Sequence, residues 1–372
     1  MTSSDTKERL DAIKTLSEIK NPKTVVPLLR LFTENSWKIQ DAVLQVLVSI
    51  ITPSIEPLFI ALESEDPKIR QAAIRVTGHL KDPRAVKFLL KYLQDEKWFV
   101  RRIVLEVLGD LKDPHAIDAI IHALNDRSKD VQLGAIWTLA SFNDQRVVDP
   151  LLQFLNHEDW NFRRIAALAL GKLNDSRAVE PLCQLLKDDN PNVRRDVVEG
   201  LAQLNDRRAV VPLLNILDDN DIQVRSRTVK ALGQFKDLRA LKPLLNLLED
   251  ESFDVRYSAA KALGKFNDFR TLIPLLRMLK EDSARMRSEI IRILDNLAVV
   301  APQELLHRII DFLINDGVNL TERTLLITLT YLTRLSPTPN DLTPLEGLFA
   351  SLLLIGPTDV RITRLIRQLL KK

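Results

Sequence analysis

A stretch of 31 residues repeats along most of this 372-residue chain, and it constrains the fold more than any other feature. The phrase D-x-R-A-V-x-P-L-L begins at positions 31 residues apart: Asp82, Asp113, Asp144, Asp175, Asp206, Asp237 and Asp268. Asn21 and Ile51 hold the same position upstream, which gives nine repeats. A period of about 20–50 residues is typical of a solenoid, in which each repeat packs on its neighbours.

Each repeat predicts two helices joined by a polar turn. In one repeat the first helix is RAVVPLLNIL, residues 208–217, where Pro212 falls in the opening turn and removes no needed N–H. The second is IQVRSRTVKALGQF, residues 222–235, whose apolar residues share one face. Aromatic residues make up only 5% and glycines number 10, which favours helix packing over an all-β sandwich. We predict an all-α fold.

The repeats do not cover the two ends of the chain. Residues 1–20 are expected to form an N-terminal cap helix, with the helix itself at 5–19, and residues 21–298 form the solenoid. After residue 298 the period fails, so residues 299–372 are expected to form a divergent helical cap or small bundle. The segment SPTPNDLTP, residues 336–344, is the expected linker within it.

The repeats resemble HEAT repeats, specifically the short subtype named after the phycobilisome lyases. A repeat of that subtype reads approximately A-V-x-P-L-x-x-L-L-x-D and then V-R-x-x-A-A-x-A-L-G, and residues 21–298 match it throughout. The resemblance implies a right-handed α-solenoid of about nine helix pairs whose second helices line a concave surface. It is specific for fold and says little about function, since one fold serves many functions.

An acid and an arginine recur at the turn between the two helices of a repeat. The acid ends the first helix and the arginine opens the second, six residues later, so the two are expected to face each other across the turn. The pairs include Asp95 with Arg101, Asp188 with Arg194, Asp219 with Arg225, and Asp250 with Arg256. In HEAT proteins the resembling residues form a structural ladder between repeats, and a catalytic pair would not recur along an array.

The ladder pattern fails at two positions near its middle. Gln132 stands where other repeats have the arginine, and His157 replaces the acid of the following repeat. We predict a softer joint there.

Positions on the second helices that do not face the stack show two groups of residues. An apolar cluster is formed by Ile103, Leu133, Trp137, Ile165 and Leu168, and Gly134 is expected to leave room beside the tryptophan. A basic stretch follows, formed by Arg227, Lys230, Lys261, Lys265 and Arg292. An apolar patch rimmed by charge indicates a binding site, although tilted helices could instead place these residues in the core.

Other features restrict the function. Cys183 is the single cysteine and lies in an apolar slot, so we expect a buried, inert thiol and neither a disulfide nor a cysteine-based metal site. The five histidines show no metal spacing, and no phosphate loop or nucleophile elbow is present. The N-terminus lacks an apolar signal region and no segment is long enough to span a membrane, which favours a cytoplasmic protein.

These observations favour a protein-interaction scaffold or adaptor without catalytic residues, metal or cofactor. Its partner is expected to be an extended or helical protein segment on the concave face, and an acidic segment is one candidate. The resemblance leaves a second hypothesis, a phycobilin lyase or assembly factor whose apolar cluster holds a linear tetrapyrrole. Nucleic-acid binding ranks third, because the formal net charge is only +3 and few aromatic residues accompany the basic stretch.

Overall fold

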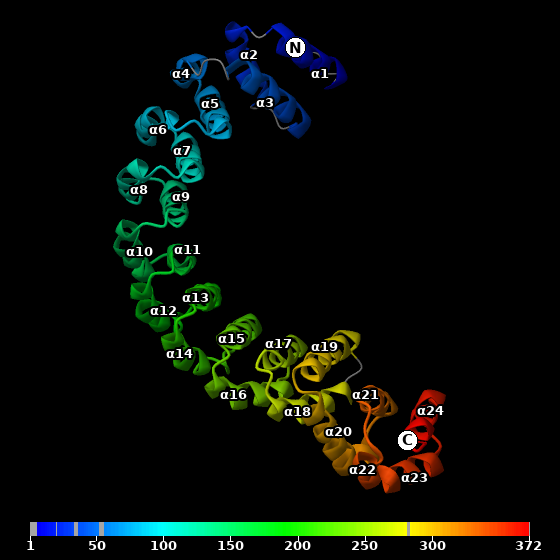
Figure 1. The fold of residues 1–372 in the computed structure, drawn as a ribbon. Helices are drawn as coiled ribbons and strands as arrows, with labels where there is room; N and C mark the ends of the chain where they lie inside the picture. The colour runs from blue at the N-terminus through cyan, green and yellow to red at the C-terminus, as the bar shows by residue number, and fades with distance from the viewer. Residues whose placement is uncertain (1–5, 20, 33–35, 52–55, 281–282, 372) are drawn as a thin grey trace. The chain divides into compact units, whose positions relative to one another are not determined.

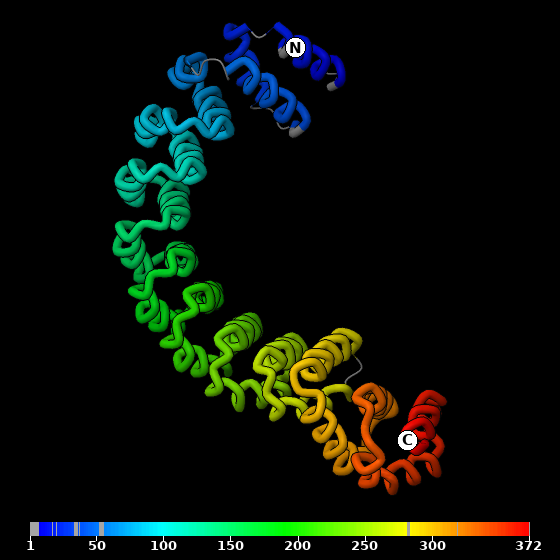
Figure 2. Tube along the Cα trace, viewed as in Figure 1, coloured from blue at the N-terminus to red at the C-terminus, as the bar shows by residue number. Residues whose placement is uncertain are grey.

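The computed structural model describes residues 6–19, 21–32, 36–51, 56–280 and 283–371, and these form helices and turns with no strand among them. Contacts divide the chain into two compact units, Met1–Leu185 and Leu186–Lys372, called here the N-terminal and C-terminal units. Figure 1 labels the helices along the chain, and Figure 2 traces the same path. The all-α solenoid predicted from the sequence is therefore confirmed.

Within the N-terminal unit the helices alternate between two rows (Figure 1). Helix α1 (Thr6–Ile19) occupies the segment where the sequence analysis expects a cap helix. The first helices of the repeats are α2 (Val25–Phe32), α4 (Glu56–Leu62), α6 (Ala85–Leu89), α8 (Ile117–Ala123), α10 (Val148–Gln153) and α12 (Val179–Leu185). The second helices are α3 (Trp37–Ile51), α5 (Pro67–Leu80), α7 (Trp98–Leu111), α9 (Lys129–Leu139) and α11 (Trp160–Leu173).

The C-terminal unit continues the same alternation and then departs from it. Its second helices are α13 (Pro191–Leu204), α15 (Ile222–Phe235), α17 (Phe253–Leu263) and α19 (Ala284–Val300), and its first helices are α14 (Val210–Leu214), α16 (Leu241–Asn246) and α18 (Leu272–Arg277). The remaining helices are α20 (Pro302–Asp316), α21 (Glu322–Arg334), α22 (Pro339–Leu342), α23 (Glu346–Ile355) and α24 (Val360–Leu369). Helix α22 lies inside the segment expected to be a linker, where Thr338 and Asp341 form a capping box, so that expectation is wrong.

The recurring aspartate organises the start of each first helix. The Asp237 side chain accepts a hydrogen bond from the backbone N–H of Arg239, and the Arg239 guanidinium returns to the same carboxylate at 2.9 Å. These bonds lower the pKa of Asp237 to about 2. Most residues just before the recurring aspartate, including Lys236, have left-handed backbone angles, which end the preceding second helix. The D-x-R phrase is thus a turn that links one repeat to the next.

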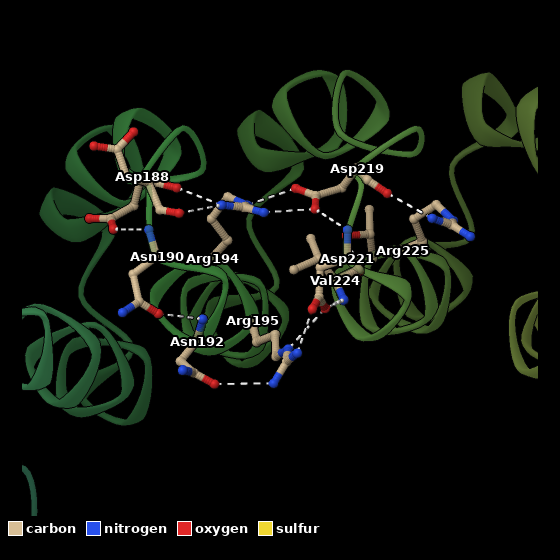
Figure 3. Close-up of polar contacts among 11 residues, drawn as sticks. Asp188, Asn190, Asn192, Arg194, Arg195, Asp219, Asp221, Val224 and Arg225 are labelled. Atoms are coloured by element: carbon tan, nitrogen blue, oxygen red, sulfur yellow. Dashed lines mark hydrogen bonds and ion pairs between the residues drawn. The ribbon is translucent and has the colours of Figure 1, made fainter.

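A second set of arginines connects neighbouring repeats. Arg194 donates from Nε and Nη2 to the carboxylate of Asp219 at 2.7 and 2.8 Å, and from Nη1 to the backbone carbonyl of Asp188 at 2.7 Å (Figure 3). Arg194 therefore binds the carbonyl of its own repeat and the carboxylate of the next one. The same two-way contact is made by Arg70 with Asp95, by Arg101 with Asp126 and by Arg225 with Asp250.

This geometry corrects the pairing expected from the sequence. Asp95 and Arg101, like Asp219 and Arg225, do not pair through the carboxylate of the acid, although they belong to the same turn. Arg256 likewise donates to the carbonyl of Asp250 at 2.8 Å. The carboxylate partner lies 25 residues after the arginine, in the next repeat, because the stacking of turns brings it there. For Arg256 that position is Glu281, which lies outside the described residues.

The two irregular positions in the ladder belong to one rung. Gln132 and His157 are 25 residues apart, the spacing that joins each arginine to its carboxylate elsewhere. The His157 ring lies 4.2 Å from the Phe162 ring, centroid to centroid, and its Nδ1 accepts from the backbone N–H of Asp159. Gln132 and His157, together with Phe154, line a cavity of about 440 Å³. The arginine and the carboxylate found at this spacing elsewhere are therefore both missing from this rung.

Loss of an intact rung should destabilise the protein. Arg225→Ala should lower the free energy of unfolding by about 3 kcal/mol, because Asp250 would lose a bidentate partner in a mostly buried position. Denaturant unfolding followed by circular dichroism measures the loss. Arg239→Ala removes an exposed guanidinium from the same unit and should leave the stability nearly unchanged. Equal losses in the two variants would contradict a special role for the ladder.

Restoring the missing rung requires both residues. Gln132→Arg alone should gain little, since the Asp126 carboxylate already holds Arg101 and His157 Nδ1 already accepts a bond. Combined with His157→Asp, it should show a favourable coupling energy of about 1–3 kcal/mol in a double-mutant cycle. The cycle cancels the loss of the ring stacking that His157→Asp causes by itself. Additive effects of the two substitutions would show that the rung does not form.

Candidate functional site

Trp137 lies on α9 in the row of second helices of the N-terminal unit. Its side chain is 44% exposed, and Leu133, one helical turn earlier on the same face, is half-buried. The Nζ of Lys172, from α11, lies 3.7 Å from the centroid of the Trp137 ring. This is a close cation–π contact, which binds Lys172 to the indole and leaves part of the ring open to solvent.

The neighbouring helix α11 contributes two further apolar side chains. Ile165 and Leu168 are both half-buried. Leu168 precedes Lys172 by one helical turn, so Leu168 and Lys172 share a face of α11. Helices α9 and α11 pack against each other. We call Leu133, Trp137, Ile165, Leu168 and Lys172 the Trp137 cluster. It is an apolar patch with one cation over its largest ring.

Ile103 does not belong to this surface. Its side chain is only 3% exposed, and it is one of the residues that line a cavity of about 680 Å³ between α2, α3, α5 and α7. The sequence analysis places Ile103 with the exposed apolar residues, because Ile165 occupies the same position two repeats later. Equivalent positions on α7 and α11 are therefore buried to different degrees, and Ile103 is not an exposed member of the predicted apolar cluster.

Gly134 makes room for an arginine instead of the tryptophan. A Cβ atom at Gly134 would lie 2.7 Å from Cδ and 2.9 Å from Nε of Arg102, which comes from α7. The glycine thus permits the Arg102 side chain to cross α9 closely. The expectation that Gly134 leaves space beside Trp137 is corrected accordingly.

The basic stretch of the C-terminal unit separates into paired and unpaired residues. Arg227 pairs with Asp196 at 3.4 Å, and Arg292 forms a short ion pair with Glu289. Lys230, Lys261 and Lys265 make no ion pair or hydrogen bond within the described part of the chain. The unneutralised charge in the stretch is therefore carried by the lysines.

A fourth lysine joins this group. Burial lowers the pKa of Lys265, and the positive charges of Lys261, Lys236 and Arg292 lower it further. Lys236 is the exposed left-handed residue at the end of α15, and it too has no ion-pair partner among the residues described. We call Lys230, Lys236, Lys261 and Lys265 the lysine cluster.

A small cavity of about 270 Å³ lies between α15, α17 and α19. It is lined by Gln223, Ser226, Lys230, Asp254, Tyr257, Ser258, Lys261 and Arg285. The buried hydroxyls of Ser226 and Ser258 form a hydrogen bond of 2.9 Å. The Arg285 guanidinium lies 4.1 Å from the centroid of the Tyr257 ring, so it covers that ring. Two lysines and two serine hydroxyls thus line the same cavity.

Other groups give little indication of chemistry. Cys183 is half-buried on α12, so the fully buried thiol expected from the sequence is not found. In the ranges that the structure describes, no three His, Cys, Asp or Glu side chains are grouped so that they could hold a metal ion. None of the described helices is both long enough and apolar enough to cross a membrane.

Several residues of these sites escape sequence reasoning. Lys172 and Ser226 occupy variable positions of second helices, but nothing in the sequence shows that they meet Trp137 and Ser258 from a neighbouring repeat. Lys236 ends a helix, and its position relative to Lys265 depends on the packing of two repeats.

Comparison with known proteins places these features in a family. The family model described as HEAT repeats matches residues 55–131, 117–202, 148–221 and 210–295, which together span more than half of the chain. A search of curated proteins found no match. The HEAT resemblance inferred from the repeat is therefore confirmed.

Solved structures are similar to this chain at low sequence identity, and the first of the three below shares its fold. Kap95p, from a complex with RanGDP, is 16% identical over 96% of this chain and 57% of its own, with a TM-score of 0.60. YibA of Escherichia coli is 24% identical over 65% of this chain and 91% of its own, with a TM-score of 0.47. The CpcE–CpcF phycocyanin lyase of a Nostoc species is 18% identical over 67% of this chain and 94% of its own, with a TM-score of 0.39. On the family match, this chain belongs to the HEAT-repeat family.

Proposed function

We propose that the protein is an interaction scaffold that binds an extended or helical segment of a partner protein at the Trp137 cluster. HEAT-repeat solenoids are typical of such scaffolds, because stacked repeats present long rows of helices on which side chains vary freely. The observation that supports this site most directly is the exposed indole of Trp137 among half-buried apolar side chains.

The packing of repeats does not require a tryptophan at this position. The equivalent positions of other second helices hold Arg75, Glu106, Glu199, Lys230 and Lys261. Their repeats stack through the same helix pairs, so the stack accepts charged side chains there. Exposed aromatic residues at the centre of a patch commonly contribute most to binding between proteins. We therefore assign to Trp137 the role of contacting the partner protein.

The surroundings of Trp137 fit a protein segment. Leu133 and Leu168 offer apolar contact, while Lys172 places a cation on one face of the indole. An apolar partner side chain could cover the open part of the ring, and a partner carboxylate could bind Lys172. A tryptophan with a charged rim is typical of the centre of a protein interface.

The tetrapyrrole hypothesis combined the apolar cluster with the basic stretch. The Trp137 cluster belongs to the N-terminal unit and the lysines belong to the C-terminal unit. Only Lys172 among the cluster residues could bind a propionate at the apolar patch itself. The observations thus favour a protein segment, and bilin absorbance after incubation serves as the competing test.

Site-specific photo-cross-linking in the native cells tests the proposal. A benzophenone amino acid at position 137 should capture a discrete partner protein. The same group at Phe88 is a matched control, since Phe88 is an aromatic residue of the same unit on the row of first helices and is 40% exposed. Identical products from the two positions, or a bilin bound in place of a protein, would contradict the proposed site.

Trp137→Ala should then separate binding from stability. It should reduce the affinity for the captured partner by at least about thirtyfold, equivalent to about 2 kcal/mol for an aromatic anchor. The free energy of unfolding should fall by only about 1–2 kcal/mol, because the indole is partly exposed and gives up a cation–π contact. Titration and denaturant unfolding measure the two quantities. A stability loss of about 3–5 kcal/mol with unchanged binding would instead show a core residue.

A further inference from the structure

The lysine cluster concentrates positive charge on two neighbouring repeats of the C-terminal unit. Lys230 and Lys261 occupy the same position of α15 and α17, and Lys265 follows Lys261 by one helical turn. Neighbouring arginines such as Arg227 and Arg292 are neutralised by carboxylates, whereas the four lysines have no such partner in the described ranges. The local charge is thus strongly positive although the whole chain is close to neutral.

This arrangement carries a cost in the free protein. Lys265 is half-buried and is close enough to Lys236 and Lys261 for their charges to lower its pKa. Burial and like charge both oppose the protonated form of a lysine. An anion that bound among these lysines would relieve the repulsion and would gain charge-assisted hydrogen bonds.

We propose that the lysine cluster binds an acidic segment of a partner protein through its glutamate or aspartate side chains. This inference rests on the proposed function in one respect, namely that the ligand is a protein. It adds the chemical class of the segment and a second binding surface, located in the C-terminal unit.

The cavity beside the cluster supplies a place for a carboxylate. Lys230 and Lys261 lie on its wall, and Ser226 and Ser258 form part of its lining. Because the two hydroxyls bond to each other, one of them donates and the hydrogen of the other remains available to an acceptor. A carboxylate placed there would accept from lysine ammonium groups and from this hydroxyl. Asp254 also lines the cavity, but it lies 3.9 Å from Arg285 and is thereby balanced.

The aromatic side chains argue against a nucleic acid. Proteins that bind single strands stack bases on open aromatic faces. Tyr257 is the aromatic residue in this cavity, and Arg285 covers it at 4.1 Å while Phe253 lies beside it. Duplex binding usually engages a longer row of phosphate contacts than four lysines provide. An acidic peptide can bind without stacking on an aromatic side chain.

Binding of a fluorescent deca-glutamate peptide to the full-length protein provides the test, with fluorescence anisotropy as the readout. Lys230→Glu combined with Lys261→Glu should reduce the affinity at least tenfold. The matched control is Lys242→Glu with Lys280→Glu, which makes the same change of charge in the same unit at exposed positions outside the cluster. The control should stay within about twofold, because salt screens charges beyond about 8 Å at physiological ionic strength.

Two outcomes of this binding experiment would contradict the proposal. Equal loss in both double variants would mean that only net charge matters, and tighter binding of a single-stranded oligonucleotide than of the peptide would assign the surface to nucleic acid. Either would overturn the inference. Lys230→Gln with Lys261→Gln, checked by circular dichroism, repeats the test if the charge reversal perturbs folding. A partner that is captured at position 137 but ignores the lysine changes would refute this inference and leave the proposed function standing.

Discussion

The arginine that joins neighbouring repeats is the interaction on which this architecture depends. Arg70, Arg101, Arg194 and Arg225 each bind two places at once, as Arg194 does with the Asp188 carbonyl and the Asp219 carboxylate (Figure 3). Each thereby fixes the turn of its own repeat and the position of the next. A buried guanidinium is costly unless every donor is used, so the contact permits few alternative geometries. The apolar core holds the helices together, and the ladder determines how adjacent turns align.

Where a rung is missing, the chain keeps its fold and loses this constraint. Gln132 and His157 replace the charged pair together, and the His157 ring packs on Phe162 instead. The same two repeats carry the Trp137 cluster, since Gln132 and Trp137 both lie on α9. A joint without its ion pair can adjust more easily when a partner binds. Under the proposed function, the missing rung and the exposed tryptophan would serve the same binding event.

The sequence predicts the fold well because the repeat is so regular. The bounds of α15 coincide with the predicted segment 222–235, since its apolar spacing, Asp221 before it and the D-x-R phrase at Asp237 after it mark them. The direction of the ladder could not be predicted in the same way. An arginine six residues from one acid and 25 from another satisfies either pairing, and only the stacking of turns selects the longer one.

The candidate sites were only partly predictable, because the repeat period does not determine side-chain contacts between repeats. Helix periodicity identified Trp137, Lys230, Lys261 and Lys265 as surface residues, but it did not distinguish the buried Ile103 from the half-buried Ile165. Contacts between repeats, such as Lys172 with Trp137, depend on side-chain placement that a period cannot supply. The charge pairing of Arg227 and Arg292 likewise appears only once neighbouring carboxylates are placed.

Amide hydrogen exchange tests most directly whether the ladder controls the stability of the joints. The backbone N–H of Asp159 follows the missing rung, while those of Ser128 and Asp221 follow intact rungs and are bonded to ladder carboxylates. Exchange measured by mass spectrometry should be fastest in the turn that contains Asp159, because Gln132 and His157 stand there in place of the arginine–carboxylate pair that holds the other two turns. Equal protection of the three turns would contradict the account, since the rungs would then contribute nothing to local stability.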